Sequence, residues 1–270
     1  LISSIDSIQF AAHELYGAPF IAAVMIAFVM WSIRDKPKRV FAFLVSLPLI
    51  IVIAWLFGNS LGYDSTDILG ASLSRGQIGM VVLLPALMAV PATFSLIREN
   101  SEKKKIPFFA HFIHLGLVLL VIGHIMSTTI IDRGTYEHSV TLIKDEKVEW
   151  GGYEFEFVDV VTETEGLEVG DGYLGAVINV YEDGELIDTV EPGVIRFDSR
   201  ARSEVDRVTT WHGDIVLIMD GTQARSLMEG SDLVRIMVYD LPGIHLVWGG
   251  WSLMLLASLA IWAPRRHPTD

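Results

Sequence analysis

Three histidines lie in one apolar stretch of the chain, residues 106–126, and they are its first candidates for chemistry. The stretch contains no Asp, Glu, Lys or Arg. It is long enough to cross the roughly 30 Å hydrocarbon core of a bilayer as a single helix. Ionisable side chains inside a membrane are costly and usually face the interior of a helix bundle. Because neutral imidazole is also a common axial ligand of haem iron, the stretch is a candidate haem-binding helix.

The three histidines are His111, His114 and His124. A helix places His111 and His114 on one face, because they are three residues apart. Gly116 and Gly123 also share a face, roughly 160–180° from His114 at about 100° per residue. The glycines could seat a neighbouring helix and leave the His114 side free for a ligand. Spacing alone leaves two interpretations of His114 open, a haem ligand or a hydrogen bond to a neighbouring helix.

The composition sets the context of this stretch. Of the 270 residues, 51% are hydrophobic, and the mean hydropathy of +0.44 is too high for a single soluble domain. The chain has no cysteine, which excludes disulfides, thiolate metal sites and a Cys-x-x-Cys redox motif. It also lacks the common phosphate-binding, serine-hydrolase and zinc-protease motifs. No catalytic residue is predicted.

Apolar segments of suitable length predict five membrane spans, with the histidine stretch as the fourth. The segments are 17–33, 40–57, 76–97, 106–126 and 244–263. The polar residues between the second and third spans, 58–75, are expected to form a loop.

The distribution of Lys and Arg predicts the orientation of the spans. Five spans put the segments 34–39, 98–105 and 264–270 on one side, and these hold 10 of the 11 Lys and Arg residues outside the acidic segment 132–242. Positive residues favour the cytoplasmic side of a membrane. We therefore expect a multi-pass protein of the cytoplasmic (inner) cell membrane, with residues 128–242 outside the cytoplasm.

Residues 128–242 are polar and rich in short runs of β-forming residues, such as the alternating Tyr153–Val158. The turn Glu182-Asp-Gly-Glu185 between two such runs is typical of a hairpin. Residues 132–242 hold 25 acidic and 9 basic residues, a net charge of −16, so nucleic acid is an improbable partner. The pattern predicts an all-β domain, a small barrel or sandwich of seven or eight strands.

The predicted fold class is a membrane α-helical bundle of five spans plus an extracytoplasmic all-β domain. Residues 1–127 would hold the first four transmembrane helices, 128–242 the β domain, and 243–270 the fifth helix with a cytoplasmic tail.

Four stretches, in this order and spacing, resemble the C-terminal part of the CcmF family, the haem lyases of cytochrome c maturation. They are Tyr16-Gly-Ala-Pro-Phe20 with Arg34-Asp-Lys-Pro-Lys-Arg39; Ile113-His-Leu-Gly116 through Gly123; Gly172-Tyr-Leu-Gly-Ala-Val-Ile-Asn-Val-Tyr181; and Val234-Arg-Ile-Met-Val-Tyr-Asp-Leu-Pro242 with Trp248 and Arg265-Arg266. The family's tryptophan-rich haem-handling motif has no counterpart here. The resemblance therefore implies one subunit of a split CcmF.

That resemblance implies a membrane subunit of a cytochrome c haem lyase. The implied partners are an N-terminal CcmF-like subunit bearing the tryptophan-rich motif, a haem chaperone, apocytochrome c and the lipid bilayer. His114 matches the family's transmembrane haem histidine, which implies that it is an axial ligand of a haem b iron shared with the partner subunit. His111 and His124 match no residue of the family pattern.

One helix cannot supply both axial ligands of one iron. The other histidines of the spans, such as His245, lie at span ends, so the second ligand is expected from the partner. Basic residues near the cytoplasmic side are candidates for the haem propionates: Arg34, Lys36, Lys38, Arg39 and Arg98. Two alternatives remain, a cytochrome-b-like electron-transfer subunit and a haem-free structural anchor that presents the β domain.

Overall fold

The computed structural model describes residues 2–58, 65–68, 71–101, 105–131, 138–163, 171–197 and 200–263. Its internal contacts divide the chain into two compact units. One unit is helical and comprises Leu1–Asp132 and Pro242–Asp270, and the other is built of strands and comprises Arg133–Leu241.

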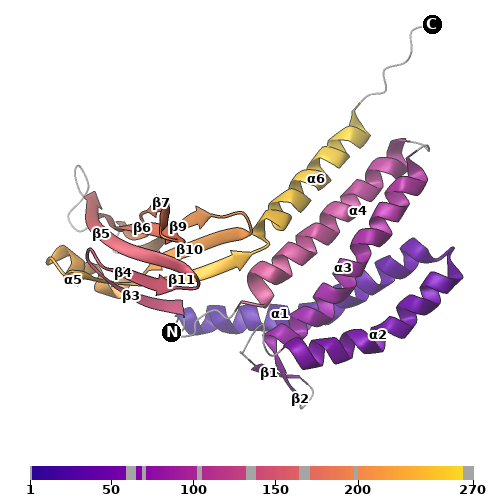
Figure 1. Cartoon of the computed structure of the whole chain (residues 1–270), viewed down its shortest axis with the longest axis horizontal. Coiled ribbons are helices and arrows are strands. Elements are labelled where there is room, and N and C mark those ends of the chain that lie inside the picture. The colour runs from indigo at the N-terminus through magenta and orange to yellow at the C-terminus, as the bar shows by residue number, and fades with distance from the viewer. Residues whose placement is uncertain are drawn as a thin grey trace, which may run out of the picture. The chain divides into compact units, whose positions relative to one another are not determined.

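The helical unit contains long helices whose ends follow local sequence signals (Figure 1). Pro37 lies in the first turn of α2, where its missing N–H costs nothing. Ser74 and Gln77 form a capping box at the start of α3: Gln77 N donates to Ser74 Oγ, and Ser74 N donates to Gln77 Oε1. The helices are α1 (Ile2–Ile33), α2 (Pro37–Phe57), α3 (Arg75–Asn100), α4 (Lys105–His124) with the π-helix η2 (Ile125–Thr129), and α6 (Ile244–Trp262).

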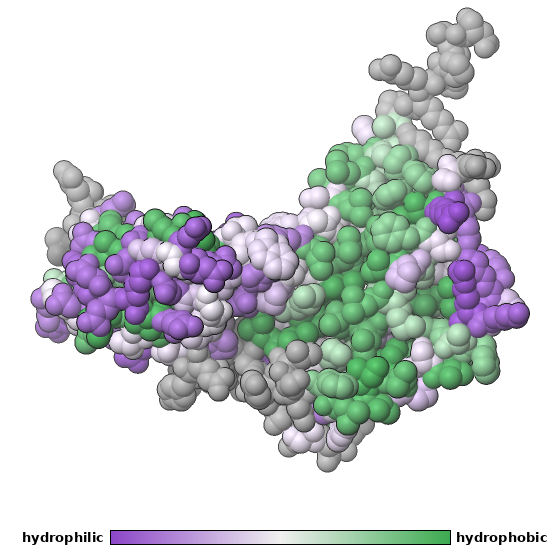
Figure 2. Space-filling view, in the orientation of Figure 1, coloured by the Kyte–Doolittle hydropathy of each residue, from purple (hydrophilic) through white to green (hydrophobic). Residues whose placement is uncertain are grey.

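Four segments of the described chain are long and apolar enough to cross a membrane: Pro37–Phe57, Arg75–Asn100, Phe108–Thr129 and Ile244–Trp262. Four of the five predicted spans are thus present as candidates. The remaining predicted span, the first in chain order, corresponds to Gly17–Ile33, a shorter apolar stretch at the end of α1. Figure 2 shows hydrophobic residues covering most of the visible face of the helical unit, as expected for helices that face lipid.

Small residues let α1, α3 and α4 approach one another closely. Ala86 and Ala89 of α3 are fully buried, and they pack in one cluster with Met25 of α1 and Val118 and Ile122 of α4. Small side chains are common at helix interfaces in membranes, because van der Waals packing drives the association there. This packing holds the histidine helix against α1 and α3.

The loop predicted for residues 58–75 is corrected by the structure. It contains a short antiparallel hairpin of β1 (Ser65–Ile68) and β2 (Ala71–Ser74). Pairs of four-residue strands are hard to recognise in sequence, because polar Gly, Ser and Asp residues favour loops.

The second unit is a nine-stranded antiparallel sheet, in strand order β3-β11-β10-β9-β8-β6-β5-β4 with β7 paired to β6 (Figure 1). A 3-10 turn (Gly221–Gln223) and the short helix α5 (Ala224–Met228) join β10 to β11. The strands are β3 (Ser139–Ile143), β4 (Lys147–Trp150), β5 (Tyr153–Glu163), β6 (Gly172–Glu182), β7 (Glu185–Val190), β8 (Gly193–Phe197), β9 (Arg200–Thr209), β10 (Gly213–Met219) and β11 (Leu233–Pro242).

One end of this strand path, β3, reaches β5, the strand next to the other end. Lys144, just after β3, forms a bridge with Phe157 of β5, and Asp145 N donates to Phe157 O at 2.9 Å. The sheet encloses a single core that includes the fully buried Phe155, Phe157 and Leu217. Between the two predicted alternatives, this closure favours a small barrel.

The sequence predicted seven or eight strands in this unit, and the structure has nine. Five of the β-forming runs in the sequence, 140–143, 153–158, 176–181, 214–219 and 233–239, correspond to β3, β5, β6, β10 and β11. A sixth run, 208–211, overlaps only the last two residues of β9, and β4, β7 and β8 were not predicted individually. The predicted hairpin turn is confirmed between β6 and β7, where Asp183 and Gly184 have positive φ angles of 52° and 80°. Figure 2 shows a mostly hydrophilic visible face on this unit, in keeping with its acidic composition.

Candidate functional site

Two histidines of α4 meet two aromatic residues of α1. The ring centroids of His111 and His114 are 5.8 Å apart. The Phe28 ring lies 5.3 Å from His114, and the Trp31 ring lies 5.8 Å from His114 and 6.3 Å from His111. We call Phe28, Trp31, His111 and His114 the four-ring cluster. It is the largest group of contacting rings among the described residues of the helical unit.

Helical periodicity on both helices produces the cluster. Phe28 and Trp31 are three residues apart, as are His111 and His114, so each pair occupies one helix face. Sequence analysis identified the histidine pair but not its aromatic partners. The Phe28–Trp31 spacing was the available signal, yet aromatic residues three apart are equally typical of lipid-facing helix surfaces.

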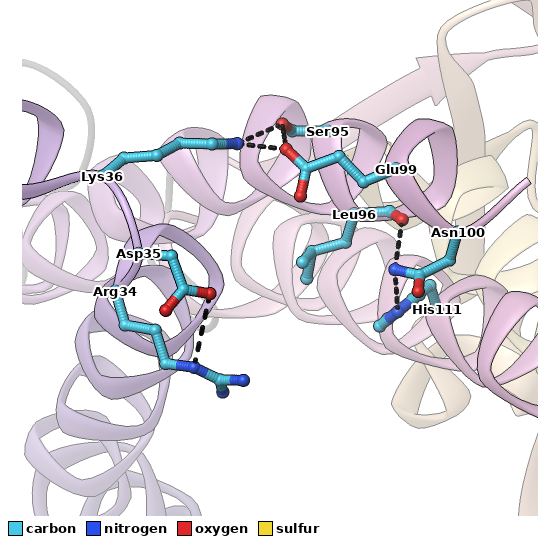
Figure 3. A network of polar contacts seen from close by, with 8 residues as sticks. All are labelled: Arg34, Asp35, Lys36, Ser95, Leu96, Glu99, Asn100 and His111. Carbon is cyan, nitrogen blue, oxygen red and sulfur yellow. Dashed lines mark hydrogen bonds and ion pairs between the residues drawn. The ribbon is translucent and has the colours of Figure 1, made fainter. Parts of the chain in front are cut away.

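Asn100, at the end of α3, distinguishes the two histidines (Figure 3). Its Nδ2 donates to Leu96 O at 2.8 Å, which fixes the orientation of the amide, and lies 3.1 Å from His111 Nε2. An amide nitrogen only donates, so His111 Nε2 accepts and the ring proton resides on Nδ1. His111 thus makes the helix-to-helix hydrogen bond that was one of the two interpretations open for His114, and its Nε2 is engaged.

His114 has a different environment. Its side chain is partly exposed, and its Nδ1 is buried without a hydrogen-bond partner among the described residues. A buried polar atom without a partner costs roughly 1–3 kcal/mol, which binding of a ligand at the imidazole can offset. An axial histidine uses one ring nitrogen for iron and usually donates from the other to an acceptor. The residues present therefore fit a single axial haem ligand whose acceptor lies outside the described residues.

The opposite face of α4 packs against α6, as the glycine spacing predicted (Figure 1). A Cβ built on Gly116 would lie 2.6 Å from Gly250 O, and one on Gly123 would lie 2.7 Å from Gly243 O. Only glycine allows backbones this close. The glycine face therefore seats a helix, while the His114 face is turned towards α1.

His124 lies apart from the four-ring cluster. It is the last residue of α4, its side chain is exposed, and its carbonyl accepts a hydrogen bond from Thr128 Oγ1. Within the described residues there is no group of three or more His, Asp or Glu side chains placed to hold a metal ion.

The basic residues near the cluster differ in their contacts (Figure 3). The Arg34 guanidinium lies over the Trp31 ring, 5.3 Å from its centroid, and pairs weakly with the exposed Asp35 at 3.8 Å. Lys36 forms an ion pair with Glu99 and a 3.1 Å hydrogen bond to Ser95 Oγ, so its charge is already balanced. Of the predicted propionate partners, Arg34 is the one that contacts a ring of the cluster.

The strand unit has a polar cluster of its own. His212 Nε2 lies 3.6 Å from Asp240 Oδ1 and 3.4 Å from the Tyr153 hydroxyl. Burial raises the pKa of the Asp240 carboxyl above its ordinary value, and the nearby His212 opposes part of that rise. Burial also raises the pKa of Tyr153. His138 donates from Nδ1 to Val238 O at 3.0 Å, so it has a structural partner.

Comparisons with known proteins place this architecture. Neither protein-family models nor curated protein sequences give a match. Among solved structures, a protein titled "Cytochrome c Heme Lyase CcmF" is similar, with a TM-score of 0.52 and 18% sequence identity over 82% of this chain. The chain has a CcmF-like fold. This agrees with the fold expected from the sequence resemblance, and at this identity the similarity concerns the fold alone.

The chain spans 34% of the length of that CcmF structure. The CcmF-like fold thus corresponds to a part of the larger protein.

Proposed function

We propose that this chain is a membrane subunit of a cytochrome c haem lyase and that His114 supplies an axial ligand to a haem b. The observation that carries the proposal is the buried, unpartnered Nδ1 of His114 within the four-ring cluster of a CcmF-like fold. The Asn100 bond to His111 leaves His114 as the better candidate of the pair. Bound haem would supply an iron that exchanges one electron.

The residues of this chain would bind and orient the haem. His114 would hold the iron, Phe28 and Trp31 would pack beside the imidazole, and Arg34 would offer a cation to a propionate. The apolar surroundings exclude water, which strengthens each of these electrostatic contacts. A second axial ligand would come from a partner subunit that also carries the tryptophan-rich haem-handling motif.

The acidic strand unit would lie outside the cytoplasm and dock a basic partner, such as an apocytochrome c or a haem chaperone. Its composition supports this proposal, because complementary charge accelerates and orients association.

Two experiments separate the alternatives. A haem-free structural anchor predicts no haem absorption bands in the purified complex. A cytochrome-b-like electron-transfer subunit predicts haem bands but normal cytochrome c maturation in a deletion strain. The haem lyase proposal requires both haem bands and a maturation defect.

We expect the chain to retain little haem when it is purified without its partner. One axial histidine gives roughly half of a bis-histidine site, and loss of supporting ligand contacts lowers metal-site affinity by about 10–100-fold. The measurement is the ratio of Soret to protein absorbance for the chain alone and for the co-purified complex. A full haem complement in the isolated chain would contradict the partner proposal.

The topology can be tested by cysteine labelling, because the chain contains no cysteine of its own. Asp35→Cys places a thiol in the basic loop after α1, and Met228→Cys places one in α5 of the strand unit; both positions are exposed. A membrane-impermeant maleimide added to intact spheroplasts should label Met228→Cys and label Asp35→Cys only after lysis. The reverse pattern would refute the proposed orientation.

A further inference from the structure

The hairpin turn between β9 and β10 presents a large aromatic side chain to the outside. Trp211 is 87% exposed. The turn is closed by hydrogen bonds from Thr210 N and Oγ1 to Gly213 O, at 2.8 and 2.9 Å, so the outward position of Trp211 is fixed by the backbone. Single exposed apolar side chains are common on proteins. Trp211 differs because its turn contacts the end of β11, a few residues before a candidate membrane span.

The turn is fastened to the end of β11. His212, next to Trp211, lies 3.6 Å from Asp240 and 3.4 Å from the Tyr153 hydroxyl. Asp240 is four residues before Ile244, where the candidate membrane span α6 begins. Four residues of fully extended chain cover at most about 14 Å. Chain connectivity alone therefore keeps this turn close to the level at which the chain enters the bilayer.

The chemistry of the turn also differs from that of the rest of the unit. Residues 209–213 contain no charged side chain, although the unit is strongly acidic. The other end of β10 and β11 carries Asp220, Arg225 and Glu229. Arg207, Asp214 and Asp240 lie beside the turn, but Trp211 at its tip can enter a headgroup layer without burying a charged side chain.

Further aromatic residues lie near the end of β11 and in the first turns of α6. Tyr239 stacks on His138 with ring centroids 4.8 Å apart, and His138 lies 5.9 Å from Trp150. The first turns of α6 expose Trp248 and Trp251. Tryptophan and tyrosine prefer the membrane–water interface, where the ring is apolar and its N–H or O–H remains hydrated.

We propose that Trp211 inserts into the headgroup layer of the bilayer and anchors the strand unit to the membrane surface. The His212–Asp240 contact positions the turn, and Trp211 contacts the lipid. The proposal is independent of haem binding, because none of these residues belongs to the four-ring cluster.

Spin labelling of the full chain in vesicles of phosphatidylcholine and phosphatidylglycerol tests this anchor. One nitroxide is attached at Trp211→Cys and, in a second protein, at Met228→Cys. Met228 is the matched control: it is 66% exposed and apolar, and it lies beyond the far end of the seven-residue β10, roughly 20 Å along the strand. Accessibility of each label to oxygen and to a water-soluble nickel chelate is measured by electron paramagnetic resonance.

We expect the ratio of oxygen to nickel accessibility to be severalfold higher at 211 than at 228. Equal ratios would overturn the proposal, because the turn would then lie in water. A label at 211 that neither reagent reaches would also overturn it, since the turn would then be buried against protein. Lipids brominated near the headgroup give a second measurement: they should quench the wild-type tryptophan emission more than that of Trp211→Phe, and equal quenching would contradict the anchor.

Discussion

Replacing His114 with alanine is expected to remove most of the haem b from the purified complex and to lower cytochrome c maturation in parallel. The change deletes the proposed axial ligand and leaves the helix able to form, because alanine is the best helix former. Loss of supporting contacts around metal ligands already costs about 10–100-fold in affinity, so loss of the ligand itself should cost at least that much. The measurements are the Soret absorbance per complex and the yield of a reporter cytochrome c.

His111→Gln is the matched control, because it lies one helical turn away and the glutamine oxygen can still accept the hydrogen bond from Asn100. Haem content should then remain near that of the wild type. His114→Gly with added imidazole should restore part of the Soret band, which a purely structural role would not allow. An unchanged Soret band in His114→Ala would assign His114 to packing against Phe28 and Trp31.

The second large effect is expected at Gly250, where Gly250→Ala should destabilise the helical unit by about 1–3 kcal/mol through overpacking. A Cβ at this position would lie 2.5 Å from Gly116 O and 2.8 Å from Leu120 N. Both are backbone atoms of α4, so relief requires that α4 and α6 move apart. The thermal unfolding midpoint in nanodiscs measures the loss.

The neighbouring glycine provides the control for this substitution. Gly249 has no heavy atom within 4 Å of a built Cβ. Gly249→Ala should therefore leave the thermal unfolding midpoint unchanged or raise it, because alanine favours the helix over glycine by up to about 1 kcal/mol. Equal destabilisation by both substitutions would show that α4 and α6 do not pack through Gly116 and Gly250.

The sequence was sufficient for features that depend on neighbouring residues. Apolar length predicted the segments that became α2, α3, α4 and α6, because a bilayer selects uninterrupted hydrophobic runs. Periodicity placed Gly116 and Gly123 opposite His114, because residues seven apart share a helix face. Strand alternation and the Asp183–Gly184 turn predicted most of the sheet for the same reason.

The tertiary structure decided which histidine is engaged and how the strands close. The partner of His111 is Asn100, from the preceding helix, and the rings beside His114 come from α1, more than eighty residues earlier in the chain. The bridge from Lys144 to Phe157 likewise brings β3, at one end of an eight-strand path, beside β5, the strand next to the other end. Such contacts join residues far apart in the sequence. They depend on which helix face or strand edge packs against which, and local sequence patterns do not determine that.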